Sequence, residues 1–441
     1  MRASALIRLK QRLQPTRGFR RDYFINRRIN PAATNSKRSK DFDNTLLWER
    51  REKMENLEFF EFHVPTRILF SVDAVESNLE SVLKSIKVSK ILLAADAGVI
   101  KAGLADKIEK VIRSCNIQYA LYGQVATEPD TEMVREGVEF AKGEKCDLII
   151  GLGGGSALDT AKIISLLLTH GGDIADYEGV GVIPDEPLIP LIGIPTTAGT
   201  GSEVTAAALA TDKERGDKVS LIGSRLSYDV AIVDPVMTLT MPPLVTASTG
   251  MDVLTHAIES VTSLRGEPIV ESIALRTIRL VGENLKSAVS EGKNMNYRTA
   301  MSLASVMAGI CIRQAIAGAA HSMAHAAGGL FPVPHGTACG MFLSEVMEYN
   351  LSSAPEKYAL IAEAMGVDIS GLSPEEAGRR GIEEVRKLYL DIGLPTTLHN
   401  FGVKANDIEL LAEKALGDGC TFTNPRPCEQ DDFVKLYRKF I

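Results

Sequence analysis

Short apolar runs and longer amphipathic stretches divide this chain into two parts. Over residues 68–234, strand-like apolar runs alternate with helical patterns, which predicts a parallel sheet covered by helices. Four of the strand-like runs are at residues 90–95, 117–122, 147–152 and 189–194. After Pro242 and Pro243 the strand pattern stops, and an Ala-, Leu- and Glu-rich sequence with helical periodicity follows. We therefore expect an α/β domain at 54–234 and an all-α domain at 235–441.

A glycine turn joins one of these strand-like runs to a helix. The apolar run 148–152 leads directly into the turn, and a helical pattern continues over 157–168. The residues of the turn are Gly153, Gly154, Gly155 and Ser156. Backbone without Cβ atoms can approach phosphate closely, and N–H groups at a helix start favour an anion. We expect Ser156 to be the N-cap and Asp159 to close a capping box. The turn alone does not distinguish a phosphate site from a helix cap.

Polar residues follow two further strand-like runs. The run 90–95 ends in Asp96, which can accept both hydroxyls of an adenosine ribose, although aspartate is also common in simple turns. A ribose contact there would favour NAD over NADP. The run 189–194 leads into a hydroxyl- and glycine-rich loop at 196–202. Because loops at the carboxyl ends of parallel strands bind ligands in such folds, both segments are candidates for a dinucleotide site.

Four of the seven histidines and one aspartate lie between residues 252 and 335. Asp252 and His256 are four residues apart in an apolar, helical run, so both side chains project from one face. His321 and His325 repeat that spacing, and glycines and prolines then end the helix so that His335 returns from a loop. Imidazole and carboxylate suit Zn, Fe, Ni, Co or Mn, and a set without thiolate is typical of catalytic sites. A single histidine is usually a hydrogen-bonded core or surface residue, but this arrangement predicts a metal site.

Six motifs occur in the order and approximate spacing of the iron-containing (group III) alcohol dehydrogenases. They are GGGSALDTAK, PTTAGTGSE, VDPVMT, TGMDVLTHAIE, HSMAHAAGGLFPVPHG and CTFTNPRP. The resemblance covers residues 54–441, and it is specific because the paired-histidine block and the threonine-glycine loop occur together. It implies a Rossmann-like nucleotide-binding domain followed by a helical metal-binding domain of the dehydroquinate synthase-like type.

The resemblance also implies a role for each candidate residue. The implied metal ligands are Asp252, His256, His321 and His335. His325 resembles the non-ligating catalytic histidine near the substrate. The implied cofactor-binding residues are Asp96, Gly153, Gly154, Gly155, Ser156, Asp159, Thr196, Thr197 and Lys218. NAD is the expected cofactor and Fe(II) the expected ion, although this ligand set does not discriminate iron from Zn(II).

The implied reaction is a reversible hydride transfer between a small primary alcohol or diol and NAD, giving an aldehyde or ketone. Within the same fold, the alternatives are a hydroxyacid-oxoacid transhydrogenase, a glycerol-dehydrogenase-like polyol oxidase and a dehydroquinate-synthase-like lyase that reoxidises its own cofactor. A non-catalytic NAD- and metal-binding subunit is disfavoured by the intact ligand set and His325. The resemblance alone suggests a homodimer or larger homo-oligomer.

Charge is distributed unevenly along the chain. Residues 1–53 contain 15 Lys and Arg against 5 Asp and Glu, whereas residues 54–441 contain 34 against 51. The acidic balance of the longer part argues against a general nucleic-acid-binding surface. No apolar run reaches the roughly 18 residues that a membrane span needs. The six cysteines form no close metal-type pair, so we interpret them as reduced cytosolic thiols, mostly in the core.

Two interpretations of residues 1–53 compete. The basic start MRASALIRLKQRLQ resembles a mitochondrial transit peptide, which would place the protein in the mitochondrial matrix. Alternatively, residues 49–53 back-translate to a purine-rich bacterial ribosome-binding sequence, and the protein begins at Met54 and is cytoplasmic. We favour the second interpretation because MENLEFFEFHVPTRILF resembles the usual start of the family. In both cases we expect residues 1–53 to be largely disordered and to take no part in the chemistry.

Overall fold

The computed structural model describes residues 59–126, 129–213, 215 and 217–441. Residues 60–441 form one compact unit. The expectations for residues 1–53 lie outside the described residues. The domain boundaries at 54–234 and 235–441 stay a prediction.

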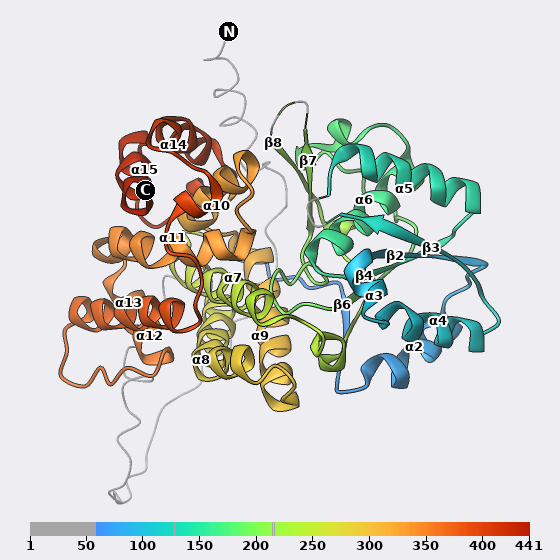
Figure 1. Ribbon diagram of the computed structural model, residues 1–441, viewed down its shortest axis with the longest axis horizontal. Helices are drawn as coiled ribbons and strands as arrows, with labels where there is room; N and C mark the ends of the chain where they lie inside the picture. The colour runs from blue at the N-terminus through green and yellow to red at the C-terminus, as the bar shows by residue number, and fades with distance from the viewer. Residues whose placement is uncertain (1–58, 127–128, 214, 216) are drawn as a thin grey trace, which may run out of the picture. The chain divides into compact units, whose positions relative to one another are not determined.

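A six-stranded parallel sheet is built by the first half of this unit (Figure 1). In spatial order its strands are β1 (Arg67–Phe70), β9 (Val230–Val233), β6 (Leu191–Pro195), β4 (Leu148–Gly153), β2 (Lys90–Asp96) and β3 (Gln118–Val125). All neighbouring strands are parallel. The parallel sheet predicted from the alternating pattern is therefore confirmed, and the four predicted runs form β2, β3, β4 and β6.

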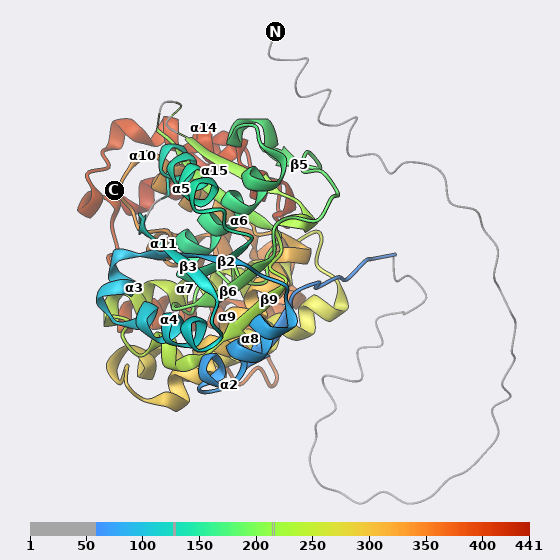
Figure 2. The same cartoon turned by 90° about the vertical axis from the view of Figure 1, so that its right-hand side faces the viewer.

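Helices bury both faces of the sheet (Figures 1 and 2). They are α2 (Ala74–Ser85), α3 (Ala97–Lys101), α4 (Leu104–Ser114), α5 (Thr131–Glu144) and α6 (Gly155–His170). Ile91 and Leu93 of β2 pack in one apolar cluster with α2 and α4. Leu92 and Ala94 pack in another with α5 and α6. Successive side chains of a strand point to opposite faces, so a continuous apolar run is what a strand buried on both faces requires.

A second, three-stranded sheet flanks α6 and was not predicted. Its strands, in spatial order, are β5 (Gly179–Val180), β8 (Asp217–Ile222) and β7 (Ala207–Asp212). β7 and β8 are antiparallel. Small residues dominate the β7 sequence AALATD, and such residues give a weak strand signal because β-propensity depends on branched and aromatic side chains.

From residue 235 onward the described chain contains helices and turns but no strand, as the pattern predicted. The α-helices are α7 (Pro243–Thr262), α8 (Pro268–Ser290), α9 (Met295–Ala315), α10 (Ala319–Leu330), α11 (His335–Asn350), α12 (Pro355–Ala364), α13 (Pro374–Asp391), α14 (Ile408–Gly417) and α15 (Gln430–Tyr437). One extensive apolar cluster joins them. The combination of an α/β part and an all-α part confirms the predicted fold class.

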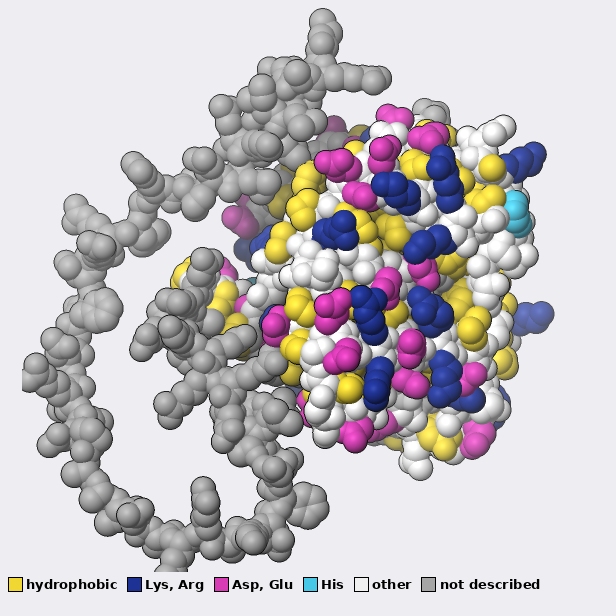
Figure 3. All heavy atoms as spheres, turned by 90° about the vertical axis from the view of Figure 1, so that its left-hand side faces the viewer, with side chains coloured by type: hydrophobic (Ala, Val, Ile, Leu, Met, Phe, Trp, Pro, Cys, Tyr) yellow, Lys and Arg dark blue, Asp and Glu magenta, His cyan; other side chains and the backbone are white. Residues whose placement is uncertain are grey.

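Two general features bear on partners of this fold. Among the described residues, no single helix is long and apolar enough to cross a membrane. Only α9 and α10 taken together reach the length and apolar composition of a membrane span, and they are bent by 101° at the break between them. On the face at the left of Figure 1, basic and acidic side chains are interspersed with apolar ones (Figure 3). That face therefore presents no single basic patch.

The predicted cap of α6 is wrong. The helix begins at Gly155, its N-cap is Gly154, and no side chain caps it. Ser156 is the second residue of the helix, so it cannot form the expected capping box with Asp159. The glycines occupy the turn because Gly153 has a φ of 154°, and a Cβ there would lie 2.6 Å from the Cβ of Ala157.

The predicted loop position of His335 is also wrong. α10 continues through Gly328 and Gly329 to Leu330, and His335 is the first residue of α11. Pro334 is the N-cap of that helix, with φ −60° and ψ 132°. Proline suits this end of a helix because its missing N–H would have no partner within the helix. The prolines therefore start a new helix instead of extending a loop.

Two glycines set the distance between the sheet and the helical part. Gly201, in the loop after β6, has a φ of +61°, and a Cβ there would lie 2.6 Å from the Cα of Gly309 in α9. A Cβ on Gly309 would lie 2.6 Å from the carbonyl oxygen of Gly201. Val204, Val233 and Val306 belong to the apolar cluster beside this contact. The backbone approach thus excludes any side chain at either position.

We predict that Gly309→Ala lowers the free energy of unfolding by about 1–3 kcal/mol, because the added methyl group overpacks a contact made by backbone. The control is Gly143→Ala in α5, where a Cβ meets nothing within 4 Å. That change should stabilise by about 0.5–1 kcal/mol. Urea unfolding followed by circular dichroism measures both. Equal unfolding midpoints for the two variants would show that the glycine contact is not needed.

Candidate active site

Three helices bring the four predicted metal ligands together. α7 carries Asp252 and His256 on one face, α10 carries His321, and α11 begins with His335. Asp252, His256 and His321 are each at most 4 % exposed, whereas the His335 side chain is 28 % exposed. The site is thus buried in the helical core and reaches solvent on the His335 side.

Three imidazole nitrogens lie close to one carboxylate oxygen. Asp252 Oδ1 lies 3.7 Å from His256 Nε2, 3.6 Å from His321 Nε2 and 3.5 Å from His335 Nε2. Ligands that lie 2.0–2.2 Å from a tetrahedral ion are separated by about 3.3–3.6 Å from one another. Within the described part of the chain, the buried Asp252 Oδ1 and His321 Nε2 have no hydrogen-bond partner. Because such atoms are normally satisfied, the donor set fits a divalent cation.

The protonation states of two of the histidines and of the aspartate suit metal binding. Against the effect of burial, Cys339 and Glu259 raise the pKa of His321 well above its ordinary value, so an ion would have to displace a proton there. Burial lowers the pKa of His256 to about 4, and burial also holds the pKa of His335 well below its ordinary value. Both imidazoles are therefore neutral at physiological pH, which is the form that ligates a metal. Burial alone would raise the pKa of Asp252, but the neighbouring histidines lower it below its usual range. The aspartate is thus a carboxylate.

A cysteine interpreted from the sequence as a core residue lies beside these donors. Cys339 is one turn after His335 on α11, and its Sγ is 3.6 Å from His335 Nε2. Its sulfur also groups with donor atoms of Asp252, His321 and His335, all within 4.8 Å of one another. Burial raises the pKa of the thiol to about 12, which opposes formation of a thiolate. Cys339 is nevertheless a second candidate for the fourth donor position, beside His256.

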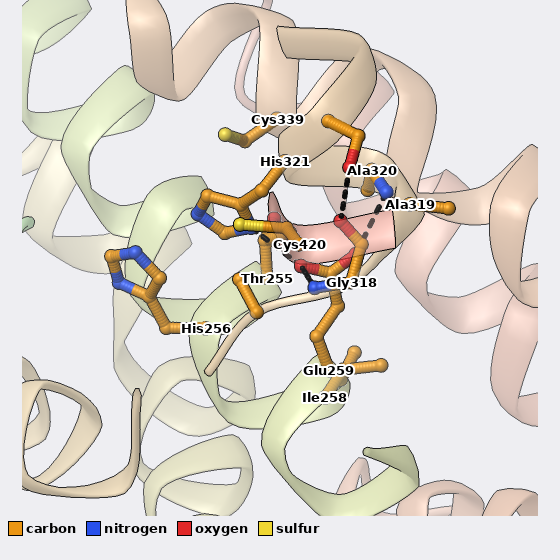
Figure 4. Close-up of polar contacts among 12 residues, drawn as sticks. Thr255, His256, Ile258, Glu259, Gly318, Ala319, Ala320, His321, Cys339 and Cys420 are labelled. Carbon is orange, nitrogen blue, oxygen red and sulfur yellow. Dashed lines mark hydrogen bonds and ion pairs between the residues drawn. The ribbon is translucent and has the colours of Figure 1, made fainter. Parts of the chain in front are cut away.

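A buried glutamate holds one of the histidines (Figure 4). Glu259 follows His256 by three residues on α7, and its Oε2 is 2.5 Å from His321 Nδ1. With Nδ1 donating to this carboxylate, His321 keeps the lone pair of Nε2 for a metal. Sequence analysis missed this residue, although a glutamate in the apolar run THAIES was a signal.

A second carboxylate orients His325. Nδ1 of His325 lies 2.9 Å from Asp418 Oδ2, and the imidazole stacks on that of His335 with ring centroids 5.3 Å apart. Asp418 Oδ1 accepts the N–H of Cys420 at 2.8 Å. Burial would raise the pKa of Asp418, but His325 and Cys420 lower it below its usual range. Asp418 was missed because it lies 93 residues from His325 in the sequence.

The predicted cofactor residues lie at the carboxyl edge of the parallel sheet. β2, β4 and β6 are neighbours and end in or just before Asp96, Gly153 and Thr196. The Thr196 N–H donates to the Gly153 carbonyl at 2.9 Å. β2 has β3 on one side and β4 on the other, so the strand order reverses here, and such switch points are where open α/β sheets bind ligands.

Asp96 serves the local structure as well. Its Oδ1 accepts the Val99 N–H at 2.9 Å and so caps α3. A Cβ on Gly153 would lie 3.2 Å from Asp96 Oδ2, so the carboxylate is directly beside the glycine turn. Its predicted contact with a ribose stays a prediction.

The threonine-glycine loop packs on the glycine turn. A Cβ on Gly154 would lie 3.2 Å from Thr197 Oγ1, and a Cβ on Gly155 would lie 2.7 Å from Thr200 Cγ2. Side chains in the turn would therefore displace the loop.

Asp159 and Lys162 of α6 hydrogen-bond to the segment that follows β6. Asp159 Oδ1 accepts the Ser202 hydroxyl at 2.5 Å, and its Oδ2 accepts the Leu209 N–H at 3.1 Å. The fully buried Lys162 donates to Thr205 Oγ1 and to the carbonyl of Ala207. Asp159 thus anchors the loop, and its predicted contact with the cofactor is untested.

The two remaining predicted residues lie on α6 and on the three-stranded sheet. Ser156 is in the first turn of α6, and Lys218 is in β8. Although burial is the main cause of the low pKa of His335, Lys218 is close enough to contribute to it. The positive charge of Lys218 therefore acts on His335, one of the predicted metal ligands.

Both parts of the chain match one protein family. Residues 65–235 match the iron-containing alcohol dehydrogenases, and residues 246–441 match the C-terminal part of the Fe-containing alcohol dehydrogenase family. Together the two matches cover nearly all of the described chain.

Similar proteins agree with this assignment. A choline dehydrogenase of Bacillus subtilis (strain 168) is 39 % identical over 390 residues, which is 88 % of this chain and 96 % of that protein. A 1,3-propanediol dehydrogenase of Klebsiella pneumoniae is 38 % identical over 86 % of this chain and 98 % of its own length. The NAD-dependent methanol dehydrogenase of Bacillus methanolicus is 36 % identical over 86 % and 99 %.

Solved structures agree as well. A 1,3-propanediol oxidoreductase superposes with a TM-score of 0.85 at 38 % identity, covering 87 % of this chain and 100 % of that one. An alcohol dehydrogenase from Oenococcus oeni gives a TM-score of 0.84 at 34 % identity, with the same coverage. The predicted metal-dependent alcohol dehydrogenase activity, the NAD dependence and the iron-type metal requirement are those of this family. The chain belongs to the iron-containing alcohol dehydrogenase family.

Proposed function

We propose that this enzyme oxidises small primary alcohols or diols with NAD, and reduces the corresponding aldehydes in reverse. The observation that supports the proposal is that three imidazole nitrogens lie within 3.5–3.7 Å of Asp252 Oδ1, and that Asp252 Oδ1 and His321 Nε2 are buried without a hydrogen-bond partner among the described residues. The named substrates of similar proteins, 1,3-propanediol and methanol among them, support this class of alcohol.

The proposed ligands of the divalent ion are Asp252, His256, His321 and His335. A bound ion would supply a Lewis acid that polarises the oxygen of the alcohol or the carbonyl. We prefer Fe(II) to Zn(II) because the family is iron-containing, although imidazole and carboxylate suit both.

The proposed dinucleotide site is the carboxyl edge of β2, β4 and β6. The start of α6 and its glycine turn would bind the pyrophosphate, because the first N–H groups of a helix attract anions. Asp96 would accept the ribose hydroxyls through the carboxylate that lies beside Gly153. The loop residues Thr196 and Thr197, fastened by Asp159 and Lys162, would line the cofactor.

His325 is the proposed proton carrier. With Nδ1 donating to Asp418, Nε2 is the ring atom that accepts a proton. The ring stacks on the proposed ligand His335 and its side chain is 22 % exposed. It therefore lies between the donor set and solvent, where it can pass the alcohol proton outward. The charged Asp418 stabilises the protonated imidazole.

We further propose a cytoplasmic homo-oligomer. Val180 of β5 and its strand neighbour Ile222 of β8 are 74 % and 39 % exposed, and Val182 nearby is 41 % exposed. Exposed apolar residues along a short edge strand support association between copies of the chain.

We predict metal-dependent NADH formation by chelator-stripped protein given NAD, an added ion and a primary alcohol or diol. Absorbance follows NADH over a panel of primary alcohols, diols, glycerol and hydroxyacids, after adding Fe(II), Zn(II), Ni(II) or no ion. Glycerol as the best substrate would favour the polyol oxidase. No net NADH despite bound NAD and metal would contradict the proposal and favour the transhydrogenase or the lyase.

We predict that His325→Ala keeps the bound metal but lowers kcat by about 10²–10⁴-fold, the usual contribution of a general base. Asp418→Asn should keep the metal and give a smaller loss, because the neutral amide does not stabilise a protonated His325. The control is His399→Ala, whose ring contacts the carbonyl of Val403 away from the site and whose loss should leave kcat unchanged. Elemental analysis measures the bound metal of each variant, and steady-state kinetics measure its kcat. Loss of metal in His325→Ala would make His325 a ligand.

A further inference from the structure

The Glu259 carboxylate receives three hydrogen bonds from one short segment. The Gly318 N–H donates to Oε2 at 2.9 Å, the Ala320 N–H donates to Oε1 at 2.7 Å, and His321 Nδ1 lies 2.5 Å from Oε2. The residue is only 5 % exposed. Figure 4 shows the carboxylate on α7 facing Gly318, Ala320 and His321 at the start of α10.

Glu259 therefore caps α10 from a neighbouring helix. Gly318 is the N-cap of α10 and has no side chain to accept the first N–H groups. A Cβ on Gly318 would lie 2.9 Å from Glu259 Oε1, so the glycine makes room for the carboxylate. The helix that carries His321 is thus joined at its first turn to the helix that carries Asp252 and His256.

The same carboxylate fixes the ring orientation and the tautomer of His321. Because Nδ1 donates to Oε2, the ring presents Nε2 toward Asp252 Oδ1, 3.6 Å away. The opposite tautomer would place a proton on Nε2 and leave no lone pair there for a metal. His256 differs, because its Nδ1 has no hydrogen-bond partner among the described residues.

We propose that Glu259 is a positioning residue that sets the metal affinity of the site, acting through His321. It fixes the ring orientation and the tautomer, and its negative charge makes the imidazole a stronger donor. Together with Asp252 it also supplies two buried negative charges to balance a divalent ion. This inference rests on the metal site proposed above, and the experiment below separates the two.

A matched control distinguishes this role from helix capping alone. Glu267 caps α8 by accepting the N–H groups of Ile269 and Val270, and among the described residues no hydrogen bond or ion pair joins it to a histidine. Glu259→Gln and Glu267→Gln therefore remove the same charge from two capping glutamates. Only the first change alters the partner of a proposed ligand.

The experiment measures the affinity of each chelator-stripped protein for Co(II) by competition with a chromophoric chelator, and the affinity for NAD separately. Glu259→Gln should weaken Co(II) binding by about 10–100-fold and leave NAD affinity and the circular dichroism spectrum unchanged. Glu267→Gln should bind Co(II) like the parent protein. Co(II) affinity equal in both variants and the parent would overturn the inference and leave Glu259 as a cap only.

Two further variants complete the test. His256→Ala should lose Co(II) binding, and parent-like binding by that variant would refute the ligand set itself rather than the role of Glu259. If Glu259→Gln does not fold, Gly318→Ala decides, because its methyl group displaces the carboxylate without removing the charge. Gly318→Ala should weaken Co(II) binding, and parent-like affinity would contradict the inference.

Discussion

The unpaired carboxylate oxygen of Asp252 is the atom on which the catalytic half of this structure depends. It lies deep in the helical core, 3.5–3.7 Å from three imidazole nitrogens, and has no hydrogen-bond partner among the described residues. A buried anion costs free energy unless it is compensated. A divalent cation compensates it and satisfies the imidazoles at the same time. The helices α7, α10 and α11 are therefore arranged around a position whose polar groups a divalent ion would satisfy.

The chemistry also requires that the two parts of the chain approach closely. The sheet offers its carboxyl edge, with the glycine turn after β4 and the loop after β6, while the helices offer the donor set. Backbone contact between Gly201 and Gly309 allows the loop after β6 to lie against α9. Buried polar side chains, Lys162 among them, keep that loop in place from the sheet side. The active site thus depends on the close packing of the loop after β6 against α9 as well as on the proposed metal ligands.

Local patterns in the sequence predicted much of this arrangement, and long-range contacts account for the rest. Four-residue spacing placed Asp252 with His256 because that relation is set by helix geometry alone. The position of His335 was misjudged because prolines that end one helix also start the next. Glu259 and Asp418 act on histidines 62 and 93 residues away. No spacing rule connects residues so far apart, so only the folded chain shows those pairs.

X-ray absorption at the zinc edge of the Zn(II)-loaded protein tests the central claim most directly. The account predicts a first shell of nitrogen and oxygen only, at about 2.0–2.2 Å, with the outer scattering of three imidazoles and no sulfur. A sulfur scatterer at about 2.3 Å would show that Cys339 replaces a histidine. Such a result, or a shell without three imidazoles, would contradict the assignment of Asp252, His256, His321 and His335 as the metal ligands.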